Sequence, residues 1–122
     1  MALILYLENR KMPILAKSLF EEAEIGDAKI YIPAMVLVEI GYLAEKERID
    51  LKLSEAETYI NSHENYHICE LDWQIIKTTF EITDIKELHD RLIAGTAMML
   101  DTLLISNDPI IENSVHVKTI WK

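Results

Sequence analysis

The sequence predicts an α/β protein with a mostly parallel central sheet covered by helices. Two observations carry this prediction. Short apolar, β-rich runs alternate with longer segments whose apolar residues recur at helical spacing. Strands that are separated by helices pair in parallel, and a parallel sheet is covered by helices on both faces. Half of the 122 residues are hydrophobic, which supplies one packed core and excludes a disordered chain.

In the first half of the chain we expect a helix-like segment over residues 3–7 and an amphipathic helix over residues 14–25. A strand over residues 28–32 and a second apolar helix over residues 33–47 should follow. Pro13 suits the first turn of the second of these, and Gly26 suits its C-terminal cap. Ser54 is followed three residues later by Glu57, which is the spacing of a capping box, so another helix should begin there.

The second half continues the alternation. We expect a strand over residues 66–71, then one helix over residues 73–82 and another from residue 88 onward. A strand over residues 102–106, a short helical turn from residue 109 and a final strand over residues 115–121 should follow. Asp72 can cap the first of these helices. No linker, repeat or low-complexity segment interrupts the order, so we predict one domain over residues 1–122. Folds of this type usually begin with a strand, whereas this chain begins with a helix-like segment.

Composition restricts the function. The net charge of −9 argues against loose electrostatic attraction to nucleic acid. It is compatible with a basic protein partner, or with a carboxylate cluster that needs a divalent cation before a phosphate can approach. The single cysteine, Cys69, excludes a disulfide within the chain and is expected in the core. No apolar run approaches the roughly 20 residues that span a bilayer, so we expect no membrane contact and a cytoplasmic location.

Glu39 is the first informative acid. Its neighbours at helical spacing are apolar, so it is expected on an apolar face. A lone carboxylate there costs several kcal/mol unless it is paired or bound to a metal. The alternative is a glutamate at the edge of the apolar stripe that reaches solvent.

Asp90 and Asp108 lie at helix–strand junctions, where ligands bind to parallel α/β sheets. Asp90 is expected in the first turn of a helix and on its buried side, although an acid there also simply favours the helix dipole. Asp108 precedes Pro109 and is also explained as an N-cap. Asp101 ends its helix, where the dipole disfavours an acid, so we expect it in solvent.

The chemistry suggested by these positions is that of carboxylates alone. With three glycines the chain has no phosphate-binding glycine loop, and it has no G-x-S-x-G nucleophile elbow. Clustered carboxylates favour hard cations such as Mg²⁺ or Mn²⁺, which activate water and clamp a phosphodiester. Beside Asp90, Arg91 is placed either to reach a phosphate or to pair with Glu87.

Three segments, "IYIPAMVLVEIGYL", "LHDRLIAGTAMML" and "LLISNDPII", in this order and spacing, resemble the PIN domain, in particular VapC-type toxins of toxin–antitoxin modules. "ALILYLEN" resembles the helix after the family's first strand. The resemblance implies a three-layer α/β/α fold and an endoribonuclease that depends on Mg²⁺ or Mn²⁺. It implies that Glu39, Asp90 and Asp108 are the metal-binding and catalytic acids, with Ser106 and Arg91 at the substrate. It also implies an RNA substrate, a homodimer and a small, partly basic antitoxin.

One departure from the family pattern matters. The family's first catalytic aspartate ends the first strand, two residues before the position matched by Met1. Either the sequence begins at an internal methionine, or the protein has lost that ligand and its strand. The second case suggests an alternative function, a catalytically silent PIN-fold module that acts through antitoxin or dimer contacts. A receiver-like signalling domain is disfavoured, because the acids follow later strands and no lysine follows a late strand as such domains require.

Overall fold

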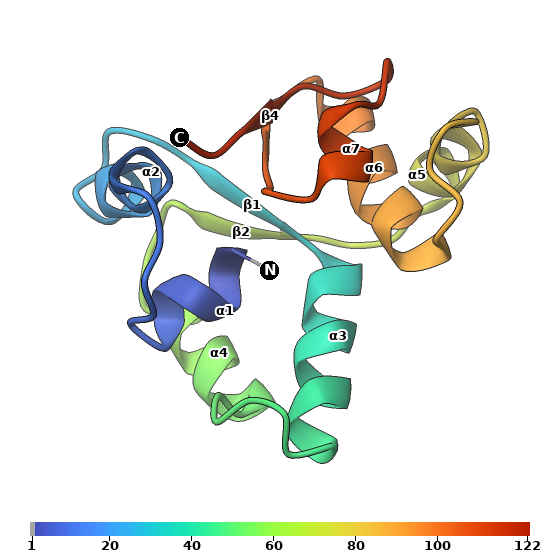
Figure 1. Cartoon of the computed structure of the whole chain (residues 1–122). Helices are drawn as coiled ribbons and strands as arrows, with labels where there is room; N and C mark the ends of the chain where they lie inside the picture. The colour runs from blue at the N-terminus through green and yellow to red at the C-terminus, as the bar shows by residue number, and fades with distance from the viewer. Residues whose placement is uncertain (1) are drawn as a thin grey trace. The chain divides into compact units, whose positions relative to one another are not determined.

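A computed structural model of the chain describes residues 2–122 and has the predicted α/β class (Figure 1). The described chain divides into two compact units: an N-terminal unit up to Cys69 together with Lys122, and a C-terminal unit, Glu70–Trp121. Every strand pair within them is parallel, as predicted. Within residues 2–122, no helix is long and apolar enough to cross a membrane.

The N-terminal unit contains four helices and two strands: α1 (Ala2–Leu7), α2 (Ile14–Glu24), β1 (Ile30–Pro33), α3 (Ala34–Glu45), α4 (Leu53–Asn61) and β2 (Tyr66–Cys69). β1 and β2 pair in register from Ile30 opposite Tyr66 to Pro33 opposite Cys69. Gly26 follows α2 with a φ of 92°, which confirms its role in ending that helix. The described chain therefore opens with a helix, as the sequence predicts.

Two local predictions in this unit are wrong. α4 begins at Leu53, so Ser54 is not its N-cap; instead Glu55 accepts a hydrogen bond of 2.9 Å from the N–H of Lys52. The helix starts early because a distant carboxylate, Glu8, accepts the N–H groups of Asp50 and Leu51 at 2.7 and 2.6 Å. This tertiary contact fixes the backbone just before the helix and overrides the local capping signal. Cys69, expected in the core, is only half-buried at the end of β2.

The C-terminal unit contains three helices and two strands: α5 (Trp73–Thr79), α6 (Leu88–Leu100), β3 (Leu104–Ile105), α7 (Pro109–Glu112) and β4 (Thr119–Ile120). β3 and β4 pair over two residues each, so both strands are much shorter than predicted. Asp72 caps α5 as expected, accepting the N–H of Ile75 at 2.9 Å. α5 ends at Thr79 and not at residue 82, because Ile82 belongs to the loop that enters the core.

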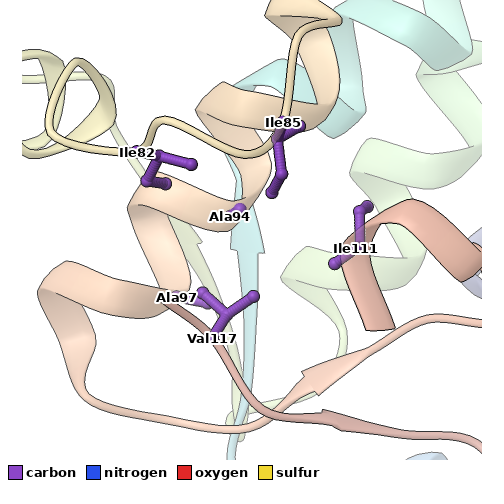
Figure 2. Close-up of a cluster of buried hydrophobic side chains, with 6 residues drawn as sticks. All are labelled: Ile82, Ile85, Ala94, Ala97, Ile111 and Val117. Carbon is purple, nitrogen blue, oxygen red and sulfur yellow. The ribbon is translucent and has the colours of Figure 1, made fainter. Parts of the chain in front are cut away.

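One hydrophobic cluster holds this unit together (Figure 2). Its members come from the loop before α6, from α6, from α7 and from the segment before β4: Ile82, Ile85, Ala94, Ala97, Ile111 and Val117. Each of these side chains is at most 8% exposed. The cluster therefore fixes α6 and α7 relative to each other. The predicted acids lie at the starts of these two helices, Asp90 in the first turn of α6 and Asp108 immediately before α7.

α5 and α6 approach closely at a glycine. A Cβ atom built on Gly95 would lie 2.2 Å from Oγ1 and 2.9 Å from Cα of Thr79. Thr79 is fully buried, and its hydroxyl donates to the carbonyl of Ile75 at 2.7 Å. Neither the backbone nor this bonded side chain can withdraw freely, so the contact requires glycine at position 95.

We predict opposite effects for two glycine-to-alanine substitutions. Gly95→Ala should lower the free energy of unfolding by about 1–3 kcal/mol, because overpacking against Thr79 outweighs the better helix propensity of alanine. Gly41→Ala, in α3, should raise it by up to about 1 kcal/mol, because the added methyl meets only Leu53 Cδ2 at 3.5 Å. Urea unfolding of both variants measures this, and equal effects would contradict the close α5–α6 packing.

Candidate active site

Asp90 lies in the first turn of α6 and is half-buried. Residues one and two turns further along its face, Ala94 and Ala97, are 0% and 5% exposed. This confirms the prediction that Asp90 lies on the buried side of the helix. A carboxylate in this position gains from the helix dipole but has lost part of its hydration.

Asp108 is the N-cap of α7, with Pro109 in the first turn. Its Oδ1 atom accepts the N–H of Ile110 at 2.8 Å. Its own N–H donates to Oγ of Ser106 at 3.1 Å, so the serine hydroxyl is tied to the same turn. The N-cap explanation of Asp108 is thus correct, and it leaves the second carboxylate oxygen outside the cap bond.

The structure brings Asp90 and Asp108 within electrostatic reach of each other. Desolvation raises the pKa of Asp90 above its ordinary value, and the negative charges of Glu87 and Asp108 raise it further, against a smaller opposite effect of His89. The charge of Asp108 therefore affects the ionisation of Asp90, although the two acids stand apart in the sequence. The hydrophobic cluster explains the proximity, because it includes side chains from both helices.

Glu87 is suggested by the sequence only as a partner that Arg91 could reach, and its role as a helix cap was missed. It is the N-cap of α6, and its Oε2 atom accepts the N–H of Asp90 at 2.8 Å. That hydrogen bond is the main cause that lowers the pKa of Glu87. Glutamate is not among the residues that normally cap helices, so its identity gave no signal. The spacing of three residues between Glu87 and Asp90 was the only available clue.

Arg91 points back toward the loop before α6. Its Nε donates to the carbonyl of Ile85 at 2.8 Å, and its Nη2 donates to the carbonyl of Lys86 at 3.1 Å. Its guanidinium lies 5.7 Å from the centre of the Phe80 ring, within the range of a cation–π contact. The predicted contact with substrate stays a prediction, and the observed partners are backbone carbonyls of this loop.

Glu39 belongs to the N-terminal unit. It is half-buried on α3, between Val38, which is 59% exposed, and Ile40, which is fully buried. It therefore lies at the border of the apolar face, and its role as a metal ligand stays a prediction. Asp101, in contrast, is exposed as expected and ends α6 in the left-handed region with a φ of 51°.

The Asp90–Asp108 pair suits a hard cation. Mg²⁺ is typically bound through one or two carboxylates while it keeps several waters. A cation held by these acids would favour the ionised form of Asp90, against the desolvation and the negative charges of Glu87 and Asp108 that raise its pKa. In the part of the chain that the structure describes, no set of three or more His, Cys, Asp or Glu side chains forms a ready metal site. The fit therefore rests on two protein ligands.

The structure has short parallel strand pairs and acids at the starts of α6 and α7, and comparison with known proteins identifies the family with this arrangement. The PIN domain family model matches residues 2–114, so the chain belongs to the PIN domain family. A chain of the VapBC2 complex from Rickettsia felis, crystallised bound to a DNA fragment from their promoter, has a similar fold with a TM-score of 0.68. The two sequences are 16% identical over 99% of this chain and 93% of that chain.

These comparisons confirm the predicted PIN-like α/β/α fold. At 16% identity the structural likeness concerns the fold and not the individual site residues. A search of curated protein sequences finds no significant match. The assignment of the acids therefore depends on the geometry described above.

The Asp90–Asp108 coupling can be measured by NMR. Asp108→Asn should lower the pKa of Asp90, because removal of a nearby negative charge favours the ionised form, while desolvation still holds that pKa above its ordinary value. Asparagine is a good N-cap, so α7 should persist. Carboxyl ¹³C titration reports the pKa directly. Asp101→Asn is the control and should leave Asp90 unchanged; an unchanged Asp90 pKa in Asp108→Asn would refute the coupling.

Proposed function

We propose that this chain is a metal-dependent endoribonuclease of the VapC type, the toxin of a toxin–antitoxin module. The observation that carries the proposal is the pair of coupled acids, Asp90 and Asp108, in a chain of the PIN domain family. Its likeness in fold to a chain of VapBC2 favours the VapC type within that family.

In this proposal Asp90 and Asp108 would hold Mg²⁺ or Mn²⁺, and Glu39 stays a ligand that only the sequence resemblance suggests. When bound, the ion supplies an activated water for attack on the phosphodiester and balances the charge that develops there. Asp90 must lose its proton to act as a ligand. Its half-buried position has already removed part of the hydration of the carboxylate.

Ser106 is the proposed contact to the RNA backbone. Its Oγ accepts the N–H of Asp108, which fixes the hydroxyl beside the acid and leaves its hydrogen to donate to a phosphate oxygen. The short strand β3 ends at Ile105, so Ser106 is the first residue after the strand. Arg91 is the other substrate contact that the sequence suggests. In the structure its side chain donates to the backbone carbonyls of Ile85 and Lys86.

We further propose a small, partly basic antitoxin and a second copy of the chain as protein partners. The net charge of −9 suits a basic antitoxin, and the structurally similar chain comes from a VapBC2 complex. The charge of the free chain opposes loose binding of nucleic acid, so the negative charge is better matched by a basic protein partner.

The direct test is cleavage of single-stranded RNA with Mn²⁺. Asp90→Asn and Asp108→Asn should each lower the rate by more than about 100-fold, because each removes a charge that holds the ion. Asp101→Asn is a matched control on the same helix, since it also neutralises one aspartate and asparagine tolerates the left-handed conformation found there. It should leave the rate within about twofold.

Two outcomes would contradict the proposal. If Asp90→Asn cleaves RNA as fast as the unaltered chain, the acid pair is not catalytic. If calorimetry detects no Mn²⁺ binding to the unaltered chain at millimolar concentration, the catalytically silent binding module becomes the better account.

A further inference from the structure

The start of α6 has an unusual construction. Its N-cap is glutamate, although short side chains such as Ser, Thr, Asp and Asn are preferred because they reach the N3 amide with little loss of freedom. Glu87 nevertheless holds the N–H of Asp90 at 2.8 Å. A longer side chain gives up more rotamer freedom to hold that geometry, so the bond gains from a backbone that is already fixed.

Arg91 supplies that restraint. It lies four residues after Glu87, and its side chain reaches back to the carbonyls of Ile85 and Lys86 at 2.8 and 3.1 Å. These are the two residues immediately before the cap. The Phe80 ring lies near the guanidinium, with its centre 5.7 Å away, and limits its sideways movement.

The loop is also held from its other side. Ile85 is 1% exposed and belongs to the hydrophobic cluster that includes Ile111 of α7 (Figure 2). The chain before α6 is thus anchored by an apolar side chain in the core and by two hydrogen bonds from a planar guanidinium. Asp90, between Glu87 and Arg91, has its backbone amide fixed by this arrangement.

We propose that Arg91 is a positioning residue for the metal ligand Asp90: it clamps the carbonyls of Ile85 and Lys86, and this clamp sets the affinity of the acid pair for a divalent cation. The inference rests on the proposed function, because it takes Asp90 to be a ligand. The role needs the guanidinium itself, since lysine carries the same charge but cannot present two fixed N–H donors to adjacent carbonyls.

Calorimetric titration of Mn²⁺ into the 122-residue chain tests the clamp. Arg91→Ala and Arg91→Lys should each weaken Mn²⁺ binding by about tenfold or more, which is the usual effect of losing a residue that orients a ligand. Lys77→Ala removes a positive charge from an exposed position on α5 and should leave the affinity within about twofold. Millimolar guanidinium ion should partly restore Mn²⁺ binding to Arg91→Ala, which a purely structural role would not produce.

A second readout does not depend on metal. Hydrogen exchange of the Asp90 amide should be faster in Arg91→Lys than in the unaltered chain, and unchanged in Lys77→Ala, because the cap loosens when the carbonyls are released. If the unaltered chain binds Mn²⁺ and Arg91→Lys binds it equally well with equal amide protection, the clamp is refuted while the proposed function stands. If the unaltered chain binds no Mn²⁺, the proposed function fails, and the exchange measurement alone decides whether Arg91 fixes the start of α6.

Discussion

The C-terminal unit depends on the burial of three isoleucine side chains, Ile82, Ile85 and Ile111, against the alanine face of α6. Each of them stabilises the fold by about 1.5–3 kcal/mol relative to an exposed position. The repulsion between two partly solvated carboxylates amounts to about 1 kcal/mol or less. Packing therefore wins, and Asp90 and Asp108 stay near each other even though their like charges oppose it.

This balance gives the site its chemical character. The cluster holds the two acids from the apolar side, while the caps of α6 and α7 hold them from the backbone side. The capping role of Asp108 and a metal-binding role are compatible, because the cap bond uses Oδ1 and a carboxylate has two oxygens. Desolvation and the charges of Glu87 and Asp108 raise the pKa of Asp90 in this arrangement, and a bound divalent cation would oppose that rise.

Sequence reasoning found the parts of the fold that local chemistry determines. The cap at Asp72, the Asp108–Pro109 helix start and the glycine after α2 follow from side-chain type and spacing alone. It failed where a distant residue decides the outcome. The start of α4 depends on Glu8, more than 40 residues away, and no local pattern reveals that contact.

The same distinction applies to the site. Asp90 and Asp108 could be selected because junctions between helices and strands are recognisable from apolar periodicity. Their coupling could not be derived, because it depends on how Ile85 and Ile111 pack. The capping role of Glu87 and the carbonyl partners of Arg91 were missed because a glutamate cap and an arginine that bonds to the backbone have no compositional signature.

The central claim is that Asp90 and Asp108 together bind a divalent cation. Paramagnetic broadening of backbone amide signals by Mn²⁺ locates such a site directly, with Mg²⁺ as the diamagnetic reference. The account predicts that substoichiometric Mn²⁺ broadens the amides at the starts of α6 and α7 first, and that Asp108→Asn abolishes the effect at both. Broadening spread evenly over the exposed acids, or centred on Asp101 at the opposite end of α6, would contradict it.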